Sequence, residues 1–232
     1  DHCYRALLQR QDSLTPSELA SLVVKRNWLL LLSGESKQAL ASCCDVLRSL
    51  GMAIPAQITP LRAGQALLRL VLQLRGEGLA RLRQLPRVSD PRAAAAMDIG
   101  LMFATSTFAH SPELFVILTE RHVDHLLRHG GHPSGPSVLV NAALIIANGL
   151  ERRAQAHELL GLASELAERY GSALDHRRQM SEQVVLQWDR PFRECLGPLR
   201  RAAAAALEAG DLESADYCES IRASLSLLSG VH

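Results

Sequence analysis

The sequence has few aromatic and few β-branched residues. Only 4% of its 232 residues are Phe, Trp or Tyr, and 42 Leu and 31 Ala stand against 12 Val, 7 Ile and 5 Thr. An all-β fold or a doubly wound parallel sheet needs the opposite bias, because β-branched and aromatic side chains favour strands whereas Leu and Ala favour helices. The composition therefore predicts an all-α protein, and 47% hydrophobic residues suffice for a buried core.

An excess of charge of one sign is also missing. The 25 basic and 24 acidic residues give a formal net charge of +1, which excludes the footprint of a general nucleic-acid or anionic-membrane binder. No apolar run approaches the ~20 residues of a transmembrane helix, and no signal peptide is recognisable. Five scattered Cys without a CxxC pair are typical of reduced thiols. We therefore expect a cytoplasmic protein with no nucleic-acid partner and no membrane insertion.

Catalytic motifs are lacking too, since neither a GxSxG elbow nor a GxxxxGK[ST] or GxGxxG phosphate cradle occurs. The densest polar cluster is His122, His125 and His129, which share one helix face, and the last two have a spacing able to chelate a metal. Imidazoles near a helix C-terminus are more simply explained by the helix dipole. A zincin needs Glu after the first His, whereas Leu126 follows His125. We predict no enzyme activity, no metal and no cofactor for this segment.

What is present is a set of legible helix boundaries. Thr15 and Glu18 form a capping box around Pro16, and the same start signal recurs at Thr59-Pro60, Asp90-Pro91 and Ser111-Pro112. Helix ends are predicted at glycines: Gly34, Gly51, Gly76, Gly130, Gly149, Gly171, Gly210 and Gly230. Together these signals predict about eleven helices, over residues 16–32, 35–50, 60–75, 78–85, 91–108, 112–129, 136–148, 151–170, 173–188, 191–209 and 212–229.

Short loops between these helices require antiparallel hairpins. Aligning three turn glycines places a small residue five positions later in each following helix, as in tetratricopeptide (TPR) units; the column is Ala39, Ala154 and Ala215. We predict antiparallel helical hairpins stacked as a degenerate TPR-like superhelix, with a compact irregular helical bundle as the alternative.

The predicted organisation is a single TPR-like helical domain over residues 12–232. Residues 1–11 are expected to be the tail of a preceding helix, and the longest connection, 130–136, is the candidate break between two packed halves. Because the chain begins at Asp1 without Met, we expect it to be a segment of a longer protein.

Three residues are candidates for partner binding. Asn141 and Asn148 lie on an otherwise apolar predicted helix, where a side-chain amide needs a hydrogen-bond partner. We expect these amides either to line an inner groove or to form a hydrogen bond with a neighbouring loop. Trp188 lies at a predicted helix-to-helix corner, which it packs as an apolar anchor or from which it contacts a ligand or partner.

Three stretches, 111–130, 188–194 and 207–215, carry a family resemblance. SPELF leading to LLRHG, then WDRPFRE, then LEAGDLESA, are similar to the TPR-like helical middle region of large bacterial multidomain signalling kinases. Those proteins combine a Ser/Thr-kinase-like domain, a STAND-type or AAA-like ATPase, this region, a GAF domain and a sensor histidine kinase or another output module. The resemblance covers about residues 35–232, and Gly131-His132-Pro133 stands where the family usually has Asn-Ser-Pro.

The resemblance implies that ATP binding and phosphotransfer belong to neighbouring domains, and it carries over no functional residue. We therefore predict a non-catalytic protein-interaction and signal-relay scaffold that binds the parent's own ATPase or kinase domains or a partner peptide. The alternative is a small-molecule effector-sensing arm of a STAND-type ATPase or transcription regulator. The few aromatic residues favour the scaffold, because ligand pockets are commonly rich in them.

Overall fold

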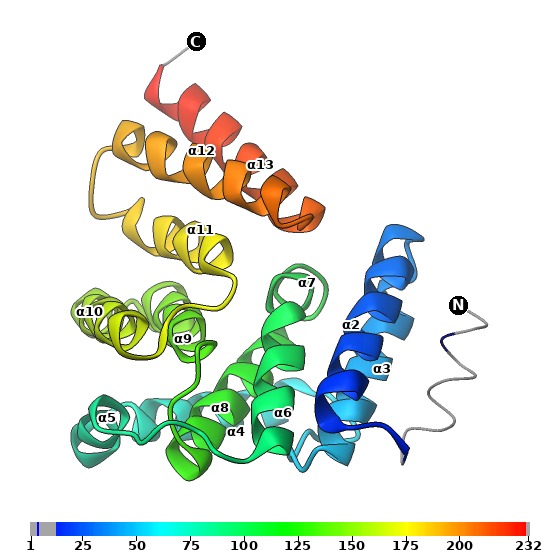
Figure 1. Ribbon diagram of the computed structural model, residues 1–232. Helices are drawn as coiled ribbons and strands as arrows, with labels where there is room; N and C mark the ends of the chain where they lie inside the picture. Colours follow the sequence, from blue (N-terminus) through cyan, green and yellow to red (C-terminus); the bar gives the residue numbers. More distant parts are fainter. Residues whose placement is uncertain (1–3, 5–12, 231–232) are drawn as a thin grey trace. The chain divides into compact units, whose positions relative to one another are not determined.

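The computed structural model describes Tyr4 and residues 13–230, and in this part the chain is all-α, which confirms the prediction (Figure 1). The predicted tail over 1–11 lies, apart from Tyr4, outside the described residues. Up to residue 132 the helices are α2 (Pro16–Leu32), α3 (Ser36–Ser49), α4 (Pro60–Gln73), α5 (Gly76–Arg83), α6 (Pro91–Met102), α7 (Ala104–His110) and α8 (Pro112–His129). After it they are α9 (Gly135–Leu150), α10 (Arg153–Tyr170), α11 (Asp175–Leu186), α12 (Phe192–Glu208) and α13 (Leu212–Ser229).

Most predicted helix starts are confirmed because they depend on local hydrogen bonds. The Thr15 hydroxyl accepts from the Glu18 backbone N–H at 3.3 Å, and a Glu18 carboxylate oxygen accepts from the Thr15 N–H at 2.8 Å. The side chains of Thr59 and Asp90 likewise accept first-turn backbone N–H groups. At Ser111 the boundary is right, but its side chain makes no capping bond.

Two of the predicted helix ends are wrong. The helix expected over 91–108 is divided at Phe103, whose N–H bonds the Gly100 carbonyl at 3.2 Å and whose ring is buried. Gly149 does not end a helix as predicted. Helix α9 continues to Leu150, and Glu151 adopts the left-handed conformation with φ of 54°. At Phe103 the break coincides with burial of the ring in the core, whereas the residues around Gly149 and Glu151 are mostly exposed and the structure gives no such reason there.

The proposed repeat column is not uniform. Ala39 and Ala215 are buried, whereas Ala154 is exposed and Ala156 takes the buried place on α10. The glycine alignment therefore does not mark equivalent positions, and the stacking of hairpins as a TPR-like superhelix stays a prediction.

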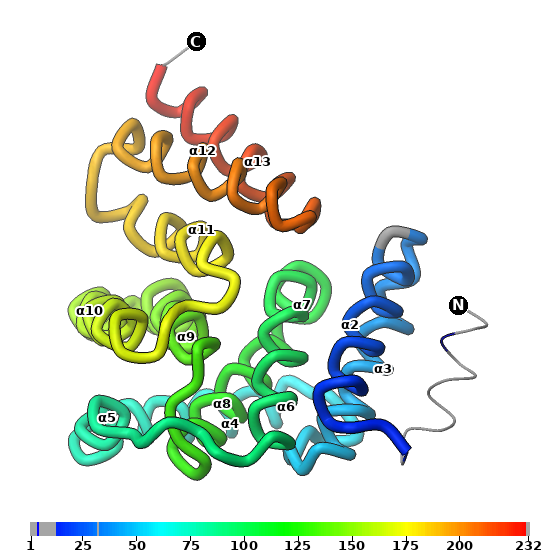
Figure 2. The backbone as a smooth tube through the Cα atoms, in the orientation of Figure 1, coloured from blue at the N-terminus to red at the C-terminus, as the bar shows by residue number. Residues whose placement is uncertain are grey.

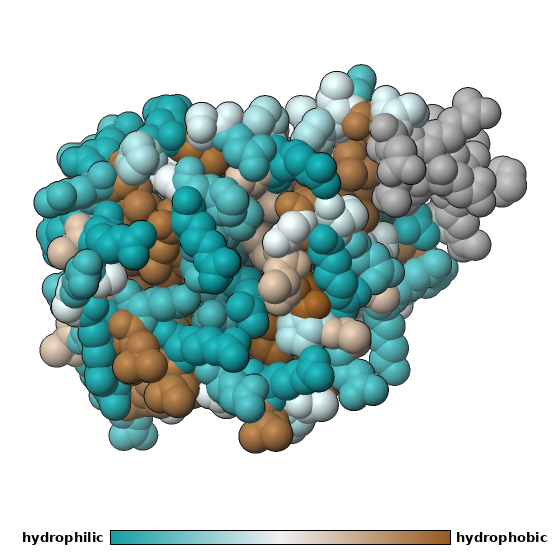
Figure 3. All heavy atoms as spheres, turned by 90° about the horizontal axis from the view of Figure 1, so that it is seen from below, coloured by the Kyte–Doolittle hydropathy of each residue, from teal (hydrophilic) through white to brown (hydrophobic). Residues whose placement is uncertain are grey.

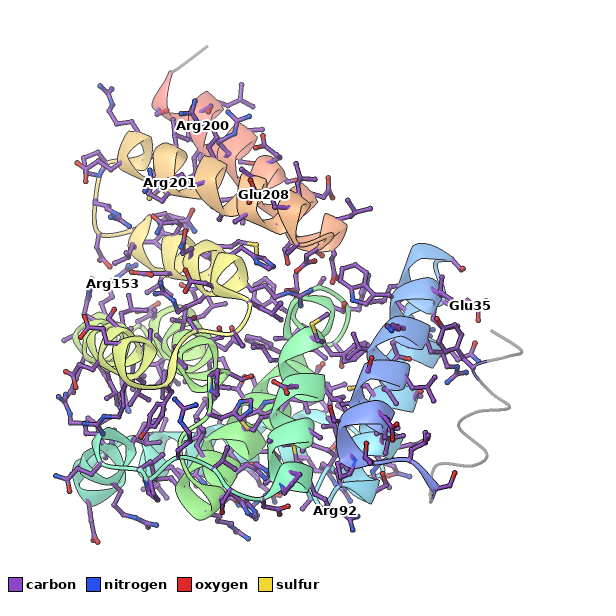
Figure 4. All side chains as sticks on the ribbon, in the orientation of Figure 1. Glu35, Arg92, Arg153, Arg200, Arg201 and Glu208 are labelled. Atoms are coloured by element: carbon purple, nitrogen blue, oxygen red, sulfur yellow. The ribbon has the colours of Figure 1, made fainter. Side chains whose placement is uncertain are left out.

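The chain divides after His132 into two compact units, and this point lies within the 130–136 connection. In the first unit α2, α3, α6 and α8 enclose one apolar core, and Arg92 at the start of α6 donates to the Ser49 carbonyl at the end of α3 at 2.8 Å (Figure 4). In the second, α12 and α13 form an antiparallel pair with its own core, which α11 completes (Figure 2). No described helix has both the length and the hydropathy needed to cross a bilayer.

The four described cysteines are free and buried, two in each unit. Cys43 and Cys44 belong to the first core, and Cys195 and Cys218 to the second. Burial raises the pKa of the Cys43 thiol well above its ordinary value and that of Cys218 to about 12. The Cys43 and Cys218 thiols therefore stay protonated at neutral pH, and all four cysteines pack as small apolar groups.

Candidate functional site

The three residues predicted from sequence do not form one site. Asn141 is buried in α9, Asn148 is exposed near the end of the same helix, and Trp188 is 58% exposed between α11 and α12. In the described part of the chain, neither amide side chain makes a hydrogen bond, so the expected bond to a neighbouring loop is not present. Asn141 and Asn148 lie on the same helix, whereas Trp188 lies outside it.

Trp188 does not anchor its corner by burial. Its indole stands edge-on to the Phe192 ring, with 6.4 Å between ring centroids. The adjacent Asp189 fixes the corner, since its carboxylate accepts from Arg153 at 3.2 Å and from His157 at 3.0 Å, both on α10; Arg153 is labelled in Figure 4. The corner is therefore held to α10 by Asp189, while the neighbouring indole lies at the surface.

The histidine cluster of α8 is dispersed among different environments. His122 is buried against Gly100, His125 bonds the Ala93 carbonyl at 3.1 Å, and His129 is exposed. Burial, reinforced by His125, lowers the pKa of His122 to about 3, so this imidazole is neutral at physiological pH. Across the described residues, no three His, Cys, Asp or Glu side chains are grouped so that they could hold a metal ion.

Ser214, His176 and Asp211 lie together in the second unit, but they are not arranged as in a catalytic triad. The Ser214 hydroxyl and the His176 Nε2 both approach Asp211 Oδ2, at 2.8 and 2.9 Å, and Arg177 Nε donates to the same oxygen at 2.5 Å. In a catalytic triad the imidazole stands between the hydroxyl and the carboxylate. Here all four side chains are buried, and the network joins α11 to the N-terminus of α13.

The most unusual surface of the first unit lies on α4. Leu61, Leu68 and Leu72 are 73%, 62% and 60% exposed. Their spacing of i, i+7 and i+11 places them within about 40° of one another around the helix, on one continuous stripe. The opposite side of α4, with Ala66 and Leu70, is buried, and α4 packs against α8. We call these three residues the leucine stripe; exposed hydrophobic groups also show as brown patches among teal ones in Figure 3.

Next to the leucine stripe lies a pocket of about 400 Å³. Its walls come from α4, from the loop before it and from α8; the residues are Ala53, Ile54, Pro55, Arg62, Gln65, Ala66, Arg69, Ile117 and Arg121. Three of these described lining residues are arginines and none is acidic, so we call it the arginine pocket. Within residues 13–230 the guanidinium groups of Arg62 and Arg69 take part in no hydrogen bond or ion pair.

The third arginine has only a poorly aligned partner. Arg121 Nε lies 3.3 Å from Glu120 Oε2, yet neither atom has a hydrogen bond in the described part of the chain. Burial raises the pKa of Glu120, and the charges of Arg121 and Arg69 counteract this shift. The buried carboxylate of Glu120 is therefore close to Arg121 and Arg69 of the pocket.

The wall formed by residues 53–55 is held by Arg48 at the end of α3. Its guanidinium donates to the Ile54 carbonyl at 3.0 Å, to the Pro55 carbonyl at 2.8 Å and to Asp45 at 2.6 Å. A second pocket of about 440 Å³ contains Arg48 and Lys37 together with Asp45, so one carboxylate offsets one of its two formal positive charges. The arginine pocket has the larger excess of positive charge of the two.

Replacing Arg48 with Ala is expected to loosen this wall. Loss of three charge-assisted hydrogen bonds should raise the amide exchange rates of residues 53–57 about tenfold, because the segment then opens more often. Hydrogen–deuterium exchange with mass spectrometry measures this, with α4 as the internal reference. Lys37→Ala on the same helix is the control and should leave these rates unchanged; equal rates in Arg48→Ala would show that other contacts hold the segment.

Sequence reasoning missed both surfaces of α4. Its hydrophobic pattern held a signal, because residues 60–74 contain more leucines than the buried side of one helix can take up. The arginine pocket had no such signal, since Arg121 joins Arg62 and Arg69 only through the packing of α8 on α4.

Comparison with family models, with curated proteins and with solved structures gives no match. The protein is therefore described by its own features. It is an all-α helical protein with an exposed leucine stripe beside an arginine pocket.

Proposed function

We propose that the chain is a non-catalytic protein-interaction and signal-relay scaffold, and that the leucine stripe of α4 is its docking surface. The observation that carries this proposal is the exposure of three aligned leucines on a helix whose other side is buried. Contiguous exposed apolar surface is a mark of interaction sites, because a soluble protein otherwise keeps such side chains from water. Its resemblance to the helical region of bacterial signalling kinases supports a relay role, and its free thiols suit a cytoplasmic location.

The occupant is an amphipathic helix with leucine-like side chains on one face and carboxylates along its edge. Arg62 and Arg69 lie on one flank of the leucine stripe, seven residues and so about 10.5 Å apart along α4. Acidic residues spaced by seven on a facing helix repeat at the same interval and would meet both guanidinium groups. Such a helix belongs either to an ATPase or kinase domain of the same protein or to a separate partner, and it would dock by the helix-in-groove mode.

A designed peptide tests this docking. We expect a helical peptide with leucines at i, i+7 and i+11 and Glu residues seven apart to bind saturably in fluorescence anisotropy. The same peptide with Lys in place of Glu should bind about tenfold more weakly, because its charges face Arg62 and Arg69.

The variant for this test is Leu68→Asp combined with Leu72→Asp, which alters exposed positions only. It should abolish peptide binding, whereas Leu227→Asp and Leu228→Asp, equally exposed on α13, should not. Circular dichroism checks that both variants fold. Equal binding of the Glu and Lys peptides, or binding unaffected by the stripe variant, would overturn the proposal.

A further inference from the structure

We propose that the arginine pocket binds a small phosphorylated organic molecule, with its phosphate monoester held by Arg62, Arg69 and Arg121 and its apolar part against the apolar lining residues. This site is separate from the leucine stripe and does not require that the stripe binds a helix. It adds ligand sensing to the first unit.

The charge of the pocket matches a phosphate monoester. Three guanidinium groups face it, and the buried Glu120 carboxylate behind Arg121 offsets one of them at most. A net charge near +2 is the complement of a phosphate monoester, which carries about −1.5 to −2 at neutral pH. Guanidinium groups bind phosphate oxygens through paired N–H donors, and Gln65 adds an uncharged donor at the same wall.

The arginines are available because their charges are not already neutralised. The guanidinium groups of Arg62 and Arg69 have no hydrogen bond or ion pair within residues 13–230, and Arg121 Nε is buried without a hydrogen bond. On α4 the polar residues follow at i, i+3 and i+7, so they line one side, and Arg121 approaches from α8. The two unpaired guanidinium groups of Arg62 and Arg69 repel one another and Arg121, whose charge Glu120 partly offsets, and a bound dianion removes that repulsion.

The size and the walls of the pocket require more than a bare phosphate. About 400 Å³ lies in the range of small-molecule sites. The lining also contains apolar groups from all three walls: Ile54 and Pro55 in the loop before α4, Ala66 on α4 and Ile117 on α8. Because Arg48 clamps the 53–55 wall through two backbone carbonyls, the pocket is formed before a ligand arrives.

Arg62 and Arg69 line the pocket and also flank the leucine stripe, which gives the ligand a route to influence docking. A phosphate bound to these guanidinium groups occupies the donors that the acidic edge of a docked helix would use. The two ligands should therefore compete.

Isothermal titration calorimetry of the full chain with phenyl phosphate tests the proposal. We expect saturable binding, at least about tenfold weaker binding of inorganic phosphate, which lacks the apolar part, and none of phenol, which lacks the charge. Arg62→Gln combined with Arg69→Gln should weaken phenyl phosphate binding at least about tenfold. Arg75→Gln, which removes one positive charge at an exposed position outside the pocket lining, should leave phenyl phosphate binding within about twofold.

Several outcomes would overturn the inference. They are absence of heat up to about 10 mM phenyl phosphate, equal binding by the double variant, and equal affinity for inorganic phosphate. Sedimentation of the chain with phosphatidic-acid vesicles that phenyl phosphate does not reverse would assign the phosphate to a lipid instead of a small soluble molecule.

The leucine-stripe variant keeps this test separate from that of the proposed function. Its uncharged version, Leu68→Asn with Leu72→Asn, should bind phenyl phosphate like the parent chain, because neither residue lines the pocket and the charge is unchanged. In the parent chain, binding of phenyl phosphate without binding of the peptide would reject the docking proposal alone.

Discussion

Asp211→Ala is expected to lower the free energy of unfolding by about 3–5 kcal/mol, the cost of breaking a buried ion pair from one side. The substitution removes the carboxylate to which His176, Arg177 and Ser214 all donate, inside a network that is shielded from water. It also removes the side-chain cap of α13, because Asp211 Oδ1 accepts the Ser214 N–H at 3.1 Å. Urea denaturation followed by circular dichroism measures the loss.

Asp216→Ala is the matched control, since Asp216 is exposed on the same helix, and its effect should stay within about 0.5 kcal/mol. Equal stability of the two variants would show that the network contributes nothing net.

The same network predicts an acid dependence. Burial by itself raises the pKa of Asp211, but the hydrogen bond from His176 and the charge and hydrogen bond of Arg177 outweigh it and hold that pKa well below its usual range. A carboxyl with a lower pKa in the folded state stabilises the fold fully above its unfolded pKa of about 3.9, and this contribution is lost as the pH falls further. The stability gap between the parent chain and Asp211→Ala should therefore be constant near neutrality and narrow below about pH 4.

Gly100→Ala is expected to destabilise the first unit by about 1–3 kcal/mol, the usual cost of overpacking a core. A Cβ on residue 100 would lie 1.9 Å from Nε2 and 2.3 Å from Cε1 of His122. The imidazole is buried and confined, so the clash is not relieved by a simple side-chain rotation. Thermal unfolding of the full chain reports the change.

Gly161→Ala on α10 supplies the contrast, since nothing lies within 4 Å of the added methyl group. There Ala should stabilise the helix by up to about 1 kcal/mol. In a His122→Ala background the penalty of Gly100→Ala should largely disappear, because the colliding ring is absent. A penalty that persists in this background would point to the backbone of α6 instead of the imidazole.

Local signals predicted much of the fold, and they failed where no nearby residue type marked the boundary. Thr15, Thr59 and Asp90 marked helix starts because their capping bonds reach only two or three residues along the chain. The break at Phe103 was not predictable in this way, since it coincides with burial of a ring in a core assembled from α2, α3 and α8. Glu151 adopts the left-handed conformation, which sequence reasoning expects at a glycine.

The candidate sites were less accessible to sequence reasoning. Trp188 was recognised as a corner residue, but its exposure and the contacts of the adjacent Asp189 with α10 depend on tertiary packing. The arginine pocket combines Arg62 and Arg69 with Arg121, more than fifty positions away, and an even overall charge balance hid this local excess. A pocket of this kind is a property of tertiary packing, whereas composition reports only an average.

Because each unit contains two buried cysteines, thiol modification can report the opening of each unit separately. Alkylating reagents react with thiolates, and Cys43 and Cys44 of the first unit and Cys195 and Cys218 of the second are all withdrawn from solvent. Each pair therefore becomes modified only when the unit that encloses it opens. A brief pulse of iodoacetamide followed by peptide mass spectrometry records the opening frequency of each half of the same molecule, without an added label. Phenyl phosphate bound in the arginine pocket would slow modification of the first pair alone, so the occupied half of the chain is identified directly.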